Sequence, residues 1–219
     1  PNEQDCLSCH NGGTNVSPMA PYANVAEEYA TPKVGHPFPA STNPHDAAEA
    51  VLLNNNRHAT CVDCHNAHGS EPVGAFPPAP LMRISQKNVP GISASDGTTL
   101  LTPALNQYEN CLRCHGASSG KQVLPIYGYF PVRAVSSGDP LNLIPQFAVT
   151  ATSSHPVMHT RSSALAQPSL LANMLNLDGI TLGRSMGTQI VCTDCHNSDD
   201  NREFGGTGAN GPHGSRRSE

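Results

Sequence analysis

The stretch CVDCHNAHGS (61–70) places two cysteines and two histidines within ten residues. Its frame returns near the carboxyl end as CTDCHNSDD (192–200), and its ending recurs in GPHGS (211–215). All eight cysteines of the chain fall in Cys-x-x-Cys pairs, and a histidine follows each pair at once. The pairs are Cys6 and Cys9, Cys61 and Cys64, Cys111 and Cys114, and Cys192 and Cys195, and the histidines that follow them are His10, His65, His115 and His196.

Paired cysteines serve disulfides in secreted proteins, four-thiolate zinc sites and covalent haem attachment. Only haem attachment requires a histidine after every pair, and four chance placements would occur at roughly a few per million. A thioredoxin-like redox pair is disfavoured because no strand–helix alternation surrounds a motif. The sequence therefore predicts four haems c, with the cysteines as thioether sites and the following histidines as proximal iron ligands.

The composition predicts a chain that lacks a conventional core. Of 219 residues, 5% are aromatic, 13% are charged, none is Trp, and Pro and Gly number 20 and 19. Such a chain favours turns and loops and is short of large apolar side chains. Its net charge of −5 argues against disorder, and a pI near 6.1 argues against a nucleic-acid partner. We expect mostly coil with a few short α-helices and little β structure, wrapped around four haems.

Local patterns place a few elements within that coil. Polar or Pro caps followed by apolar residues at helical spacing predict short helices over 43–55, 102–115 and 167–177. A strand or two interrupted by Pro is expected within 121–135. The segment EPVGAFPPAP (71–80) is the best candidate for a linker.

The two halves of the chain repeat the same signatures in the same order. CLSCH, GHPF, CVDCHN and AHGS in the first half match CLRCH, SHPV, CTDCHN and PHGS in the second. This pattern indicates an internal duplication of a two-haem unit, spanning approximately 1–75 and 105–219. We still expect residues 1–219 to form one tetrahaem unit, because haems from both halves are expected to form one row.

Seven histidines lie outside the motifs, and four irons need up to four distal ligands. The duplication makes His36 equivalent to His155 and His68 equivalent to His213, and these four are the predicted distal ligands. Pro after His36 and His155 restricts the backbone of each. His68 lies three residues beyond a proximal ligand, too close to reach the same haem, and is therefore expected to serve a neighbouring one. The alternatives are His58, His159 and His45.

The duplication suggests particular partners for these ligands. It places His36 at the haem of His65 and His155 at the haem of His196. His68 and His213 would then serve the haems of His10 and His115, in an order that the sequence leaves open.

No apolar run of the sequence is long enough to span a bilayer. The chain begins at Pro1 without an initiating Met, which we interpret as a mature, exported chain whose signal has been removed. Asn15 begins a possible glycan acceptor, Asn-Val-Ser. We therefore expect an extracellular or outer-surface location, with the periplasm as the alternative.

The four Cys-x-x-Cys-His motifs, the His-Pro and HGS signatures and the coil-rich composition resemble exported multihaem cytochromes of metal-reducing bacteria. Within that group the chain looks most like the OmcE-like tetrahaem cytochromes that form extracellular filaments. The resemblance implies low-spin, bis-histidine haems in alternating stacked and T-shaped pairs, and a homopolymer in which one distal histidine comes from the neighbouring subunit. The donor would come from the region of His36, His45 and His58. Other partners would be redox cytochromes or extracellular electron acceptors.

Three functions are compatible with this reading. The first is electron conduction through four haems in a filament, without chemical transformation of a substrate. The second is a discrete periplasmic shuttle with the same cofactors. The third is a multihaem reductase with one open iron position, which the surplus of histidines disfavours. We therefore expect the chain not to be an enzyme.

Overall fold

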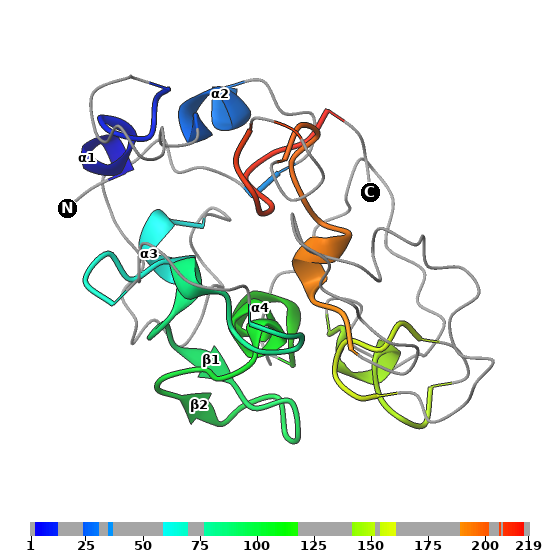
Figure 1. Cartoon of the computed structure of the whole chain (residues 1–219). Helices are drawn as coiled ribbons and strands as arrows, with labels where there is room; N and C mark the ends of the chain where they lie inside the picture. The colour runs from blue at the N-terminus through cyan, green and yellow to red at the C-terminus, as the bar shows by residue number, and fades with distance from the viewer. Residues whose placement is uncertain are drawn as a thin grey trace.

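The computed structural model describes residues 3–12, 24–30, 35–36, 59–69, 77–117, 142–151, 154–160, 189–201, 206 and 208–216. These residues are mostly coil, with short helices and one two-stranded sheet (Figure 1). The coarse prediction of a coil-rich chain with a few short helices and little β structure is confirmed. Within the described ranges, no helix has the length and apolar character needed to cross a membrane.

Short helices carry the repeated motifs. The elements are α1 (Glu3–Leu7), α2 (Val25–Ala30), α3 (Cys61–Cys64), α4 (Gln107–His115), the 3-10 turns η1 (Ile84–Gln86), η2 (Ile144–Gln146) and η3 (Cys192–Asp194), and the strands β1 (Gly91–Ile92) and β2 (Leu100–Leu101). The first cysteine of every motif lies in one of these helices or turns. Helical backbone therefore coincides with each cysteine motif.

Helix α4 covers the carboxyl part of the helix predicted over 102–115. It begins at Gln107 because the carboxylate of Glu109 accepts the backbone N–H groups of Leu105 and Asn106 at 2.9 and 3.0 Å. Just before the helix, the Met82 N–H donates to the Leu105 carbonyl at 2.8 Å, and this bond pairs Leu105 with another segment of the chain. The helices predicted over 43–55 and 167–177, the strand region 121–135, residues 71–76 of the predicted linker, and Asn15 lie outside the described residues.

The sheet is an antiparallel hairpin that pairs Gly91 with Leu101. Its connection turns at Asp96, whose carboxylate accepts the N–H groups of Thr98 and Thr99, both at 2.9 Å. Strand β1 packs directly on α4. A Cβ at Gly91 would lie 2.7 Å from Cβ of Ala104, so only glycine permits this close approach.

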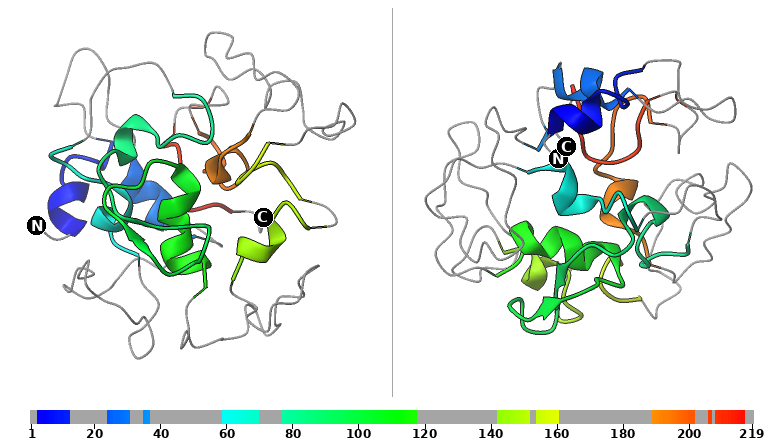
Figure 2. Two further views of the ribbon diagram at one scale, coloured as in Figure 1. Left: turned by 90° about the horizontal axis from the view of Figure 1, so that it is seen from below. Right: turned by 90° about the vertical axis from the view of Figure 1, so that its left-hand side faces the viewer.

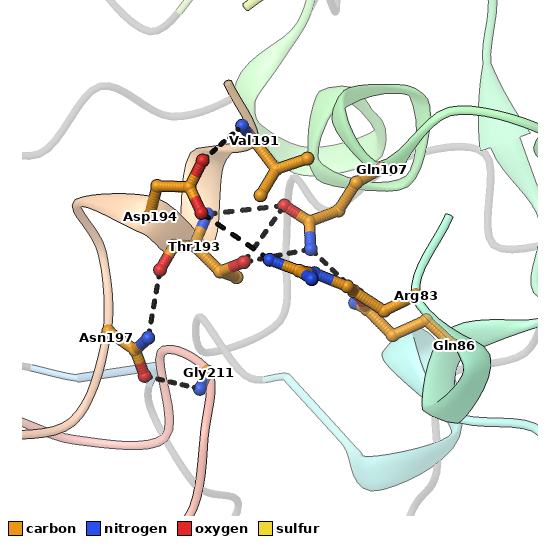
Figure 3. A network of polar contacts seen from close by, with 8 residues as sticks. All are labelled: Arg83, Gln86, Gln107, Val191, Thr193, Asp194, Asn197 and Gly211. Atoms are coloured by element: carbon orange, nitrogen blue, oxygen red, sulfur yellow. Dashed lines mark hydrogen bonds and ion pairs between the residues drawn. The ribbon is translucent and has the colours of Figure 1, made fainter. Parts of the chain in front are cut away.

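The buried interior of the described residues combines a small apolar cluster with many polar groups. Met82, Val89 and Ala104 form that cluster. Gln107 is fully buried and donates to the side chains of Gln86 and Thr193, both at 3.0 Å (Figure 3). Its carbonyl oxygen accepts the Thr193 N–H at 3.2 Å, so hydrogen bonds rather than apolar packing join α4 to η3.

Gln107→Ala should lower the free energy of unfolding by about 1–3 kcal/mol, because it leaves buried polar groups of Thr193 without their partner. The measurement is chemical denaturation of the isolated protein. Leu105→Ala is the matched control, since Leu105 is 68% exposed two residues away and should change stability by less than about 0.5 kcal/mol. Equal stability of the two variants would contradict the assignment of Gln107 as a structural tie.

Candidate haem-attachment site

Each motif forms one helical turn. In three motifs, the histidine N–H donates to the carbonyl of the first cysteine, and the third motif of the chain lies inside α4. The bonds measure 3.0 Å from His10 to Cys6, 2.9 Å from His65 to Cys61 and 2.9 Å from His196 to Cys192. Residues three and four apart share a face of a helical turn. Each motif therefore presents two thiols and one imidazole on the same side.

A carboxylate fixes the start of two of these turns. Asp63 accepts the backbone N–H of Thr60 at 2.8 Å, and Asp194 accepts that of Val191 at 2.9 Å. Both acids stand between the two cysteines of their motif, and both bond the residue just before the first cysteine. They act as the returning half of a capping box, which determines where the motif turn begins.

Arginines bind the same two carboxylates, and one of these ion pairs connects neighbouring motifs. Nη1 of Arg113, in the third motif, lies 3.3 Å from Oδ1 of Asp63, in the second. Nη2 of Arg83 lies 3.4 Å from Oδ1 of Asp194, in the fourth (Figure 3). Asn110 also donates to the Asp63 carbonyl at 2.8 Å. The motif turns are thus held at fixed positions relative to one another.

The cysteine side chains place the motifs in chain order. None of the eight cysteines, all of which the structure describes, forms a disulfide. The thiols of Cys6 and Cys61 lie close to each other, as do those of Cys111 and Cys192, and Cys114 lies near Cys64. The first motif therefore adjoins the second, the second the third, and the third the fourth, along the arc from α1 through α3 and α4 to η3 (Figure 1).

Burial keeps two of these thiols protonated. It is the largest cause that raises the pKa of Cys61 and of Cys64 to about 12. Among the described residues, which include every cysteine, no three Cys, His, Asp or Glu side chains converge as metal ligands. The thiols are thus not gathered in the tetrahedral set that a structural zinc ion uses.

The tautomer of the His65 imidazole follows from its hydrogen bond to the backbone. Its Nδ1 lies 2.8 Å from the carbonyl oxygen of Ser85. Because a carbonyl only accepts hydrogen bonds, Nδ1 carries the proton and Nε2 keeps its lone pair. Burial also lowers the pKa of His65, which favours the neutral ring that metals bind.

Two of the predicted distal ligands lie beside proximal ones. The ring centroid of His36 is 6.3 Å from that of His115, with the planes at 49°. The ring centroid of His213 is 6.1 Å from that of His65, with the planes at 8°. The duplication had suggested His36 for the haem of His65 and His213 for the haem of His10 or His115, whereas the structure places His36 beside His115 and His213 beside His65.

The other candidates have different surroundings. His68 and His155 are exposed. Nδ1 of His159 lies 3.2 Å from the Thr160 carbonyl, and its buried Nε2 has no hydrogen-bond partner. Of His155 and His159, His159 therefore has the ring whose surroundings suit a ligand better. His45 and His58 lie outside the described residues.

The sequence did not predict the residues that contact the histidine rings through their second nitrogen. Ser85 lies behind His65, and Glu28, whose Oε2 is 3.6 Å from Nδ1 of His213, comes from α2. No local pattern marks either residue, because each contact joins segments far apart in the chain.

A comparison with protein-family models, with curated proteins and with solved structures found no match to this chain.

Asp63→Ala should lower the free energy of unfolding by about 2–4 kcal/mol, because it removes the cap of Thr60 and leaves the Arg113 guanidinium without its counter-charge. Asp63→Asn keeps an oxygen acceptor and should lose less. Denaturation of the isolated protein measures both. A loss of less than about 0.5 kcal/mol for Asp63→Ala would contradict the role assigned to this carboxylate.

Proposed function

We propose that the chain is a tetrahaem c-type cytochrome that transfers electrons and transforms no substrate. Four one-turn motifs support this proposal, because each offers two thiols and one imidazole on a single face. Each thiol would add across one vinyl group of haem, with sulfur bonding one carbon and hydrogen the other, so attachment would consume no oxidant. The histidine that follows each pair would supply a ligand to the iron.

When bound, haem supplies an iron centre that accepts and releases one electron. The chain sets the order of the haems and provides the iron ligands. Neighbouring thiols of successive motifs favour a row in chain order, and partly buried histidines with lowered pKa, such as His10, His36 and His65, favour the neutral form that coordination needs. The small apolar cluster around Met82 is in keeping with a chain wrapped around haem. We place the protein outside the cytoplasm, at the outer surface or in the periplasm.

Intact-mass analysis of the native protein should give the chain plus four haems. Replacing both cysteines of one motif with serine, as in Cys111→Ser with Cys114→Ser, should remove one haem and leave three. A bare chain would overturn the proposal. A mass lowered by two hydrogens per bridge would assign the neighbouring sulfurs, such as those of Cys6 and Cys61, to disulfides instead.

We further propose that copies of the chain assemble into an extracellular filament, with a histidine donated between subunits. His68 and His155 support this step, because both are exposed while their counterparts in the duplication lie against proximal rings. His36, which the resemblance had suggested as a donor, lies beside His115 of its own chain. The discrete shuttle remains the alternative to the filament.

Negative-stain microscopy should show ordered fibres of the native protein. His68→Ala and His155→Ala should each shorten or abolish the fibres while the four haems remain attached, because the donated ligand is lost. Asp96→Asn, at an exposed loop, is the control and should leave fibres intact. Uniform small particles from the native protein would favour the shuttle and contradict assembly.

The reductase alternative makes a different spectroscopic prediction. If every iron has two histidines, the assembled, oxidised protein is fully low-spin, and the reduced protein binds no carbon monoxide. Electron paramagnetic resonance and a carbon monoxide titration measure these properties. A high-spin haem in the native assembly would reveal an open iron position and support a reductase instead.

A further inference from the structure

We infer that the two halves of the chain exchange axial ligands: His36 is the distal ligand of the haem attached through Cys111 and Cys114, and His213 is the distal ligand of the haem attached through Cys61 and Cys64. This inference rests on the proposed function and deepens it, because that function requires distal histidines without fixing which iron each one serves. Each half thus completes a haem that belongs to the other.

The spacing of the rings carries the inference. A metal–nitrogen bond to histidine is about 2.0–2.1 Å long and a ring centroid lies about 1.1 Å behind its nitrogen, so two axial imidazoles on one metal have centroids about 6 Å apart. The pairs His36–His115 and His65–His213 have centroids 6.3 and 6.1 Å apart. Parallel rings in van der Waals contact would be closer than this. The interval in both pairs is therefore wide enough for one metal between two imidazoles.

Protein groups beside three of the four rings support the same assignment. His65 bonds the Ser85 carbonyl through Nδ1, and the ring of His36 lies near the Pro212 backbone. Nδ1 of His213 is buried without a hydrogen bond and faces the Glu28 carboxylate at 3.6 Å. A metal-bound histidine commonly directs its second nitrogen to a carbonyl or a carboxylate, which fixes the ring and its tautomer.

The two ligand-bearing segments are held against each other. A Cβ at Gly35 would lie 2.9 Å from the His213 carbonyl oxygen, so the backbones beside His36 and at His213 are in direct contact. Helix α2 secures the carboxyl-terminal segment through Glu28, which accepts from Ser198 Oγ at 2.5 Å and from Ala209 N–H at 2.9 Å. Figures 1 and 2 show α2 beside this segment from each direction. The same set of contacts therefore positions both His36 and His213.

The first test replaces each ligand singly and together. His36→Gly and His213→Gly should each add one high-spin haem per chain in the oxidised protein and one carbon monoxide site in the reduced protein. The double variant should add two. Added imidazole should restore the low-spin signal, which a merely structural defect would not allow. Asp96→Asn should match the parent, and four attached haems in a His36→Gly or His213→Gly variant with no new open iron would overturn the inference.

The second test identifies the iron. In a chain that lacks the third haem through Cys111→Ser and Cys114→Ser, His36→Gly should add no high-spin signal. In a chain that lacks the second haem through Cys61→Ser and Cys64→Ser, the same change should add one. The reverse result would overturn the pairing while leaving the cytochrome intact, whereas failure of the proposed function would appear earlier, as a native chain without haem.

A third measurement keeps all four haems in place. In nuclear magnetic resonance spectra of the reduced protein, His36→Gly should shift the haem signals that have Overhauser contacts to Leu112, beside the third motif's first cysteine. His213→Gly should shift those with contacts to Val62, beside the second motif's first cysteine. Shifts confined to a haem other than the assigned one would overturn the pairing.

Discussion

The hydrogen bond from the histidine N–H to the carbonyl of the first cysteine is the constraint on which the rest depends. It closes a single helical turn in the motifs of His10, His65 and His196, at 2.9–3.0 Å. One turn suffices to place residues i, i+3 and i+4 on one face, so the chemistry needs no long helix. An isolated turn is unstable in water, because one hydrogen bond does not offset the entropy of fixing its backbone. Further contacts must therefore hold it, and in two of the motifs the carboxylates of Asp63 and Asp194 provide them.

Hydrogen bonds and ion pairs position the motifs, a role that an apolar core has in most proteins. Burying the carboxylates of Asp63 and Asp194 costs solvation that an ion pair alone does not recover, but each also accepts a backbone N–H. Hydrogen bonds depend on direction and apolar contacts do not, so these ties specify where one motif lies relative to the next. That suits a chain whose proposed task is to hold cofactors at fixed separations.

The sequence was informative where covalent chemistry sets the spacing and much less so where distant segments meet. The motifs and the carboxyl part of α4 were predictable, since both depend on residues within one or two turns. The hairpin of β1 and β2 was missed although Asp96-Gly97, with Gly97 at φ +70°, is a turn signal between its strands. The duplication showed which histidines are equivalent but not which other histidine each one lies beside. The contacts of Ser85 and Glu28 join segments that no local sequence pattern relates.

Equivalent histidines have unequal surroundings, and the crossed pairing gives that inequality a physical reason. His36 and His213 lie against proximal rings of the opposite half, while their counterparts His155 and His68 are exposed. In a tandem repeat whose units exchange ligands with their neighbours, the outermost ligands of any two units would be left to serve a further unit. Extended to a further copy, the proposed exchange would direct His155 to the first haem of a following copy and His68 to the last haem of a preceding one. The proposed pairing within one chain would then also account for the proposed polymer, because coordination inside a subunit and coordination between subunits would obey one rule.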